Sequence, residues 1–305
     1  MARCHRNGIL AAALLVATAC SSAATPSLSE PTSTSRRTTT VMATAGARWV
    51  MPLEVSWHWM IDHALDLGNE RDMGLTDPGG RRLTVPEPTV YDIDWEYNPA
   101  STVAALHDRG KKVICYVDVG VFEDYRADAA RFPAAVRGAK DSHWEGSRWL
   151  DVRRADVLLP IMEDRIRTCR DKGFDAVEPD EVDGYANESG FPLTAADQLA
   201  YNRAIADLVH RYGLSVGLKG DIDQAAALAP AFDWTLNEQC YQFDECDVLA
   251  SAFLARGKTV LVAEYDDPGA GYTVDLDRIC PKANAAGYNA MKMPLTLDGG
   301  RWPCR

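Results

Sequence analysis

Eight short apolar segments that alternate with helical patterns constrain the fold of this chain more than any other feature. The predicted strands cover residues 54–60, 89–94, 112–118, 174–179, 214–219, 232–237, 259–265 and 287–292. Predicted helices cover residues 100–109, 157–172, 195–212, 221–229, 246–256 and 275–286. A glycine follows five of these helices, as is common where a helix ends. This repeated order of helix, glycine and strand is typical of units that build a parallel sheet.

The number of strands and the length of the folded part favour a closed barrel over an open sheet. Residues 48–305 amount to about 258 residues, close to the ~250 typical of a (β/α)8 barrel. The segment 61–88 is rich in Asp, Gly and Pro and is a poor helix, so we expect it to replace the first helix of the barrel. The sequence therefore predicts an α/β protein with a single (β/α)8 TIM barrel over residues 48–305.

The N-terminal segment is typical of an exported protein. Arg3 and Arg6 precede an apolar run from Ile9 to Ala19, which is too short to span a bilayer and suits a signal peptide over residues 1–20. The small residues before Cys20 resemble a bacterial lipobox, in which Cys20 is lipidated; the alternative is ordinary cleavage near the alanines. Residues 21–47 are rich in Ser, Thr and Pro and are predicted to be a flexible linker. We therefore expect an extracellular or cell-surface lipoprotein.

Export changes what the cysteines indicate. Without Cys4 and Cys20, six cysteines remain, and an even number in an oxidising compartment favours disulfides. Proximity in the sequence favours Cys240–Cys246, and a Cys280–Cys304 bond would attach the C-terminus. Cys115 and Cys169 would then be left for each other, or would both be free buried thiols.

The charge of the chain limits the classes of partner. Lys and Arg number 32 against 44 Asp and Glu, a net charge of -12. Nucleic-acid binding needs clustered Lys and Arg, so we expect no nucleic-acid partner. A cationic partner would suit this chain better. The histidines show no metal-ligand spacing, and the sequence implies neither a metal nor a cofactor.

Acidic residues gather where the predicted strands end. In (β/α)8 barrels the chemistry lies at the C-terminal ends of the strands, and five of the eight ends carry a carboxylate here. Like charges repel, so a cluster of acids has no evident role in stability. Glycoside hydrolysis needs two carboxyl groups, and aromatic side chains can stack on sugar faces. Acids and tryptophans at the mouth of an exported barrel therefore indicate a glycoside hydrolase.

The sequence also resembles glycoside hydrolase family 114, the endo-α-1,4-polygalactosaminidases, over residues 48–294. Six stretches carry the resemblance: YDID at 91–94, VICYVDVG at 113–120, RWLD at 148–151, VEPDEVDGY at 177–185, GLKGD at 217–221 and NEQC at 237–240. The resemblance implies a (β/α)8 barrel that hydrolyses galactosamine-containing polysaccharide. It also implies two catalytic acids, which fall on Asp180 and Glu238. Family members tend to have Asn where this chain has Glu181, which makes the site more negative.

The resemblance and the strand ends together suggest a role for each candidate residue. Glu238 is the expected general acid or acid/base, and Asp180 is the partner carboxylate, although the reverse assignment is also open. Lys219 would orient a carboxylate or simply form a salt bridge at the barrel end. The remaining substrate-binding candidates are Trp57, Asp94, Asp118, Asp183, Tyr185, Glu264 and Tyr265. Acidic members of this set would form charge-assisted hydrogen bonds with a cationic amino sugar.

Two other functions remain open at this stage. One is a barrel glycosidase for another α-linked amino-sugar polymer, which would need the same acids. The other is a tethered lipoprotein that binds polysaccharide without cleaving it, which leaves the pair of acids unexplained. In each case we expect a monomer with a polysaccharide partner and no cofactor.

Overall fold

The structure is a computed structural model that describes residues 48–142, 144–269 and 271–305. These residues fall within one compact unit. The predicted signal peptide, the lipidation site Cys20 and the linker over 21–47 lie outside the described residues. Within the described part, no helix is long and apolar enough to cross a membrane.

Eight parallel strands form the centre of the molecule. They are β1 (Trp57–Met60), β2 (Val90–Asp94), β3 (Lys112–Asp118), β7 (Ala176–Asp180), β8 (Ser215–Lys219), β9 (Trp234–Glu238), β10 (Val260–Glu264) and β11 (Asn289–Lys292). They are hydrogen-bonded in chain order, and each pair is parallel. The predicted α/β barrel is confirmed, and every predicted strand lies within three residues of its expected ends.

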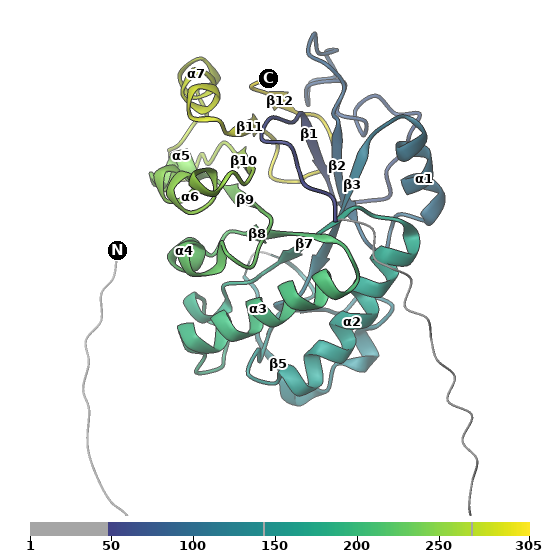
Figure 1. Cartoon of the computed structure of the whole chain (residues 1–305), viewed down its shortest axis with the longest axis vertical. Helices are drawn as coiled ribbons and strands as arrows, with labels where there is room; N and C mark the ends of the chain where they lie inside the picture. The colour runs from purple at the N-terminus through teal and green to yellow at the C-terminus, as the bar shows by residue number, and fades with distance from the viewer. Residues whose placement is uncertain (1–47, 143, 270) are drawn as a thin grey trace, which may run out of the picture. The chain divides into compact units, whose positions relative to one another are not determined.

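Side chains and the C-terminal segment join the first and last parallel strands. Asn289 on β11 accepts hydrogen bonds from the backbone N–H of Val55, at 2.9 Å, and from the indole of Trp57, at 2.8 Å. The guanidinium of Arg301 donates to the carbonyl of Trp57 at 3.0 Å. After Arg301, the short strand β12 (Trp302–Pro303) pairs antiparallel with β11. The C-terminal segment therefore pairs with β11 and contacts β1 through Arg301 (Figure 1).

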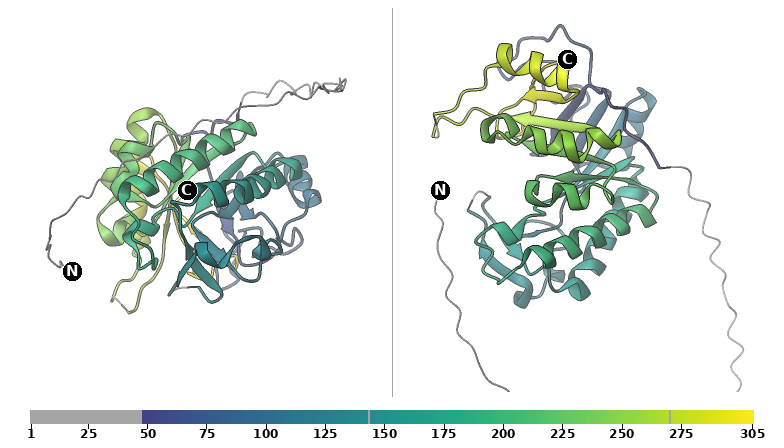
Figure 2. Two further views of the ribbon diagram at one scale, coloured as in Figure 1. Left: turned by 90° about the horizontal axis from the view of Figure 1, so that it is seen from below. Right: turned by 60° about the vertical axis from the view of Figure 1, so that its left-hand side comes forward.

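Helices surround the sheet on its outer side (Figures 1 and 2). They are α1 (Ala100–Asp108), α2 (Ala155–Lys172), α3 (Ala195–Arg211), α4 (Ala225–Leu228), α5 (Cys240–Phe243), α6 (Cys246–Ala252) and α7 (Leu276–Ala286). A capping box of Thr194 and Asp197 begins α3. Left-handed glycines at 173 and 287 end α2 and α7, as the sequence predicts. The segment 61–88 contains turns and a bridge between Thr76 and Arg82 but no helix, also as predicted.

A small antiparallel sheet between β3 and α2 was not predicted. Its strands are β4 (Val121–Glu123), β5 (Arg137–Lys140) and β6 (Ser147–Leu150), in the order β4-β6-β5. These strands have three or four residues each and mixed polarity, so they lack the apolar alternation by which a strand is recognised. They add a structured wall at the C-terminal side of β3.

The strands separate two apolar layers. Residues that face the helices form one core cluster, whereas inward-facing residues such as Trp59, Ile114, Trp234 and Leu236 form another inside the barrel. Gly217 on β8 is necessary for this inner packing. A Cβ atom there would lie 2.4 Å from the ring of Trp234, so only glycine leaves room for the indole.

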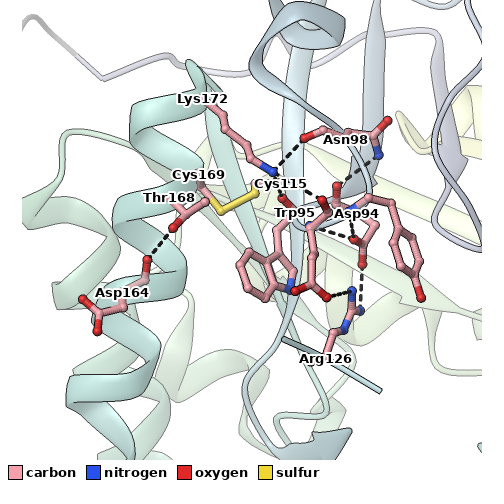
Figure 3. The surroundings of a disulfide bond; sticks show 11 residues. Asp94, Trp95, Asn98, Cys115, Arg126, Asp164, Thr168, Cys169 and Lys172 are labelled. Carbon is pink, nitrogen blue, oxygen red and sulfur yellow. Dashed lines mark hydrogen bonds and ion pairs between the residues drawn. A yellow bond between two sulfur atoms is a disulfide. The ribbon is translucent and has the colours of Figure 1, made fainter. Parts of the chain in front are cut away.

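Three disulfides join the pairs that the sequence favours, Cys115–Cys169, Cys240–Cys246 and Cys280–Cys304. The first links β3 to α2 on the helix side of the sheet, so Cys115 and Cys169 are not free thiols. Figure 3 shows that Lys172 lies on the same helix and donates to the carbonyls of Trp95 and Asn98, at 2.6 and 2.8 Å. These contacts attach α2 to the loop that follows β2.

Candidate active site

Two carboxylates and one lysine meet at the ends of three adjacent strands. Asp180, Lys219 and Glu238 are the last residues of β7, β8 and β9, which are neighbours in the sheet. Lys219 Nζ lies 3.0 Å from Asp180 Oδ1 and 2.7 Å from Glu238 Oε2. The ammonium therefore bridges the two predicted catalytic acids. Parallel strands make this juxtaposition direct, because their carboxyl ends share one edge.

Two tyrosines orient these acids from the sides. The hydroxyl of Tyr116, on β3, donates to Asp180 Oδ2 at 2.9 Å. The hydroxyl of Tyr265, directly after β10, donates to Glu238 Oε1 at 2.7 Å. Burial raises the pKa of both phenols well above the usual range, and the adjacent carboxylates raise it further. Both hydroxyls therefore remain protonated donors.

Lys219 is a buried cation with well-defined neighbours. Its side chain is 8% exposed, and Nζ lies 4.8 Å from the ring centroid of Trp59, within the range of a cation–π contact. Burial alone would lower the pKa of Lys219, but the carboxylates of Asp180 and Glu238 outweigh it and hold that pKa well above its ordinary value. The raised pKa favours the ammonium form of Lys219 between the two acids.

The two acids differ in exposure. The side chain of Asp180 is 12% exposed and receives a third hydrogen bond from the backbone N–H of Glu181, at 2.8 Å. That of Glu238 is 33% exposed. Asp180 is thus an acceptor held by three donors, whereas Glu238 has access to solvent and to a bound ligand.

An extended cleft passes over this centre. Its middle part has a volume of about 720 Å³ and contains Asp180, Lys219 and Glu238 together with Trp59 and Trp144. One side continues into a hollow that contains Asp118, Glu123, Tyr97 and Tyr125. The other side continues into a hollow that contains Asp183, Trp149 and Phe243. Glu181 lines all three parts. The cleft therefore extends beyond the acid pair into two adjoining hollows.

The backbone around Glu181 is unusual for its residue types. Glu181 has φ 57°, in the left-handed region that favours glycine. Gly120 packs against it so closely that a Cβ on Gly120 would lie 1.6 Å from the carbonyl oxygen of Glu181. This approach brings the chain after β3 against the chain after β7. It places the carboxyl of Glu181 next to Asp180, where strained backbone often has a functional role.

Burial raises the pKa of several carboxyl groups in the cleft. It raises the pKa of Asp118 and of Glu181 well above the ordinary values, and neighbouring carboxylates add to the effect in both cases. Burial and Asp180 also raise the pKa of Asp183, against the opposing effect of Lys219. Carboxyl groups held in this way gain from a cationic ligand, because its charge favours their ionised form.

Five predicted substrate-binding residues do not line the cleft: Tyr265, described above, and four others. Trp57 is buried against β11, where its indole donates to the carbonyl of Asn289. Asp94 accepts hydrogen bonds from two backbone N–H groups, and its Oδ2 lies 2.7 Å from Arg126 Nη2. Figure 3 shows this ion pair. Tyr185 donates to Asp221 at 3.1 Å. Glu264 accepts from the N–H of Tyr241 and the hydroxyl of Tyr272.

These placements have a common physical reason. Sequence position at a strand end does not distinguish a side chain that faces the cleft from one that satisfies a neighbouring loop. Asp94 and Glu264 fix the loops after β2 and β9, and Tyr265 orients Glu238 instead of forming the rim. Lys219, Asp118 and Asp183 lie in the cleft as expected.

Sequence reasoning missed several residues that the cleft contains. Trp59 and Tyr116 carried a usable signal, because each occupies an inward-facing position near the end of a strand. Trp144, Tyr125 and Phe243 carried none, since the first two lie in irregular loops and Phe243 ends the short helix α5, which was not predicted. They are exposed aromatic side chains, at 48%, 54% and 56%. Among the described residues, no group of three or more His, Cys, Asp or Glu side chains is arranged to hold a metal ion.

The comparisons with known proteins agree with this geometry. A model of glycoside-hydrolase family GH114 matches residues 38–305. The crystal structure of Aspergillus fumigatus Ega3 in complex with galactosamine is similar with a TM-score of 0.72 and 31% identity, over 85% of this chain and 98% of that chain. The glycoside hydrolase domain of PelA from Pseudomonas aeruginosa has a TM-score of 0.54 at 16% identity, over 69% of this chain and 89% of that chain, a likeness in fold alone. A comparison with curated proteins found no match.

Proposed function

The chain belongs to glycoside-hydrolase family GH114, and from this we propose that it cleaves α-1,4-linked galactosamine-containing polysaccharide internally, with Asp180 and Glu238 as its two catalytic carboxyl groups. The observation that carries the proposal is the pair of acids bridged by Lys219 in a cleft that continues into two adjoining hollows. Such a cleft has room for sugars beyond the one that is cleaved, as internal cleavage of a polymer requires. The similarity to Ega3, solved with galactosamine, supports the choice of sugar.

The surroundings of the two acids suggest their roles. Glu238 is the more exposed and is the general acid or acid/base, which must reach the glycosidic oxygen and exchange protons with water. Asp180 accepts from Lys219, Tyr116 and a backbone N–H, an environment that suits a carboxylate stabilising positive charge on the sugar ring. The cleft acids Asp118, Glu181 and Asp183 would bind ammonium or hydroxyl groups of neighbouring sugars.

We also propose that the protein is exported and held at the cell surface. A signal peptide over residues 1–20, a lipidated Cys20 and a linker would hold the barrel at the cell surface, where a polymer is accessible. Three disulfides support an oxidising compartment, in which such bonds persist. We expect the barrel to act as a monomer, because its cleft is built from one chain.

Oligosaccharide release from a defined polymer tests the reaction. The soluble domain 48–305, its Glu238→Gln variant and a Glu188→Gln control are incubated with partly deacetylated α-1,4-galactosaminogalactan and analysed by mass spectrometry. Glu188 is an exposed carboxylate outside the cleft. Galactosamine oligomers from the wild type and the control, but not from Glu238→Gln, are expected. Binding without release by the wild type would indicate a binding protein, and neither binding nor release would indicate another polymer.

A further inference from the structure

A second pair of carboxyl groups lies inside the barrel beneath the active site. Asp92 on β2 and Glu178 on β7 are both fully buried. Their side chains interact with each other, carboxyl to carboxyl. None of their four oxygens accepts a hydrogen bond from a donor among the described residues. Buried acids normally have such donors, so this arrangement requires an explanation.

The strand geometry places this pair directly under the catalytic acids. Side chains two residues apart on a strand face the same side, so Glu178 lies one layer below Asp180. In the sheet, Glu178 is the neighbour of Tyr116, and Asp92 is the neighbour of Trp59. Both of those residues line the cleft. The pair thus lies directly next to residues that line the cleft.

Two carboxylates in contact inside a protein cannot both remain ionised, because their charges repel and neither is solvated. One shared proton satisfies both groups, since the protonated carboxyl donates to the ionised one. Burial raises the pKa of both acids, whereas the nearby ammonium of Lys219 lowers it. Burial favours a protonated pair and Lys219 favours an ionised one, and a pair with one proton and one negative charge agrees with both effects.

We propose that Asp92 and Glu178 are positioning residues that share one proton, and that their single negative charge holds Lys219 between Asp180 and Glu238 and sets the pH range of catalysis. This inference rests on the proposed function. The titratable groups that face the pair are Tyr116 from β3, Asp180 from β7, Lys219 from β8 and Tyr265 after β10. Both tyrosines stay protonated, so the pair acts through Lys219 and Asp180.

Charge and shape are separated by comparing single with double variants. Asp92→Asn or Glu178→Gln alone leaves one negative charge, which accepts a hydrogen bond from the new amide. The double variant Asp92→Asn/Glu178→Gln has nearly the same shape but no charge. Without that charge the catalytic carboxyls experience more of the Lys219 field, which favours their ionised forms. Both limbs of the kcat/KM pH profile should then move to lower pH by about 1 unit in the double variant.

Each single variant should keep both limbs close to their wild-type positions. Glu264→Gln is the matched control, because it removes another buried carboxyl that is held by Tyr241 and Tyr272 and not by Lys219. Both limbs of the kcat/KM pH profile of this control should also stay at their wild-type positions. A folded double variant whose limbs do not move would overturn the proposal and leave the pair a packing role only.

Infrared spectroscopy provides a test that needs neither substrate nor the double variant. At neutral pH the wild-type minus Glu178→Gln difference spectrum should contain the carbonyl band of a protonated carboxyl, and so should wild type minus Asp92→Asn. Absence of that band from both difference spectra would show that the pair holds no proton. Because no polymer is involved, this result is independent of whether galactosamine polysaccharide is the substrate.

Discussion

Asp180 and Glu238 are both carboxylates at strand ends, yet their surroundings differ. Asp180 has three donors and little exposure, and Glu238 is open to the cleft. We expect Asp180→Asn to lower kcat by about 10³-fold, in the range found for carboxyl groups that act in the transition state. The amide has the same shape and Glu238 still pairs with Lys219, so the melting temperature should change little. Initial rates of oligosaccharide release and a thermal melt measure the two effects; substantial turnover by this variant would contradict the assignment.

The orienting tyrosines offer a graded test at the same scale. Tyr265→Phe removes one hydrogen bond to Glu238 without a large cavity, and a hydrogen bond to a charged group is worth about 1.5–3 kcal/mol. We therefore expect kcat/KM to fall by about 10-fold or more. Tyr116→Phe should act similarly through Asp180. Steady-state kinetics provide the measurement, and full activity in both variants would mean that Lys219 alone positions the acids.

At the scale of elements, the three disulfides should contribute differently to stability and to activity. Their cysteines are 54, 24 and 6 residues apart for Cys115–Cys169, Cys280–Cys304 and Cys240–Cys246. Loop-closure entropy alone gives about 4, 3 and 2 kcal/mol in that order. Denaturant unfolding of the three double Cys→Ala variants measures this ranking.

The disulfide that contributes least to stability should matter most for activity. Cys240 lies two residues after Glu238 and begins α5, so the Cys240–Cys246 bond holds the segment that directly follows the proposed general acid. Its removal should reduce kcat/KM the most although it costs the least stability. The other two disulfides lie away from the cleft, and their variants are the controls at a temperature where all three are folded. Equal losses of activity would argue against this role of the loop.

For the whole molecule, the buried acids predict an unusual dependence of stability on pH. Burial raises the pKa of Asp221 from 3.8 to about 7, and it raises those of Asp118, Glu178 and Glu181 as well. The native state therefore binds more protons than the unfolded chain at pH values between the unfolded and folded pKa values, from about 4 to about 7. Stability is then greatest at the acidic side of this window and falls as pH rises from about 4 to about 7.

Chemical unfolding at pH 5 and at pH 7.5 checks this expectation. The free energy of unfolding should be larger at pH 5. In Asp118→Asn, which cannot titrate at that position, the difference between the two pH values should be smaller. A wild-type protein that is more stable at pH 7.5 would show that depressed carboxyls such as Asp233 dominate instead.

Periodicity and glycine positions were sufficient to predict the barrel and its parallel strands, and spacing favoured the cysteine pairs. The family resemblance selected Asp180 and Glu238 among the acids at the strand ends. These features depend on patterns among neighbouring residues, which identify each strand. Because the strands are parallel, Asp180, Lys219 and Glu238 at their ends then lie at one edge of the sheet. The small β4-β6-β5 sheet escaped prediction because its strands are too short to show a pattern.

Only the tertiary structure decided which polar side chains serve the cleft. Asp94 and Glu264 occupy strand ends like Asp180, but Arg126 and the loop after β9 satisfy them. The facing of Asp92 and Glu178 across the barrel interior could not be predicted either, since these residues are 86 positions apart in the chain and are brought together by the curvature of the sheet. The sequence gives the chemical type of each residue. Its partner, its burial and hence its protonation state depend on which distant strand packs against it.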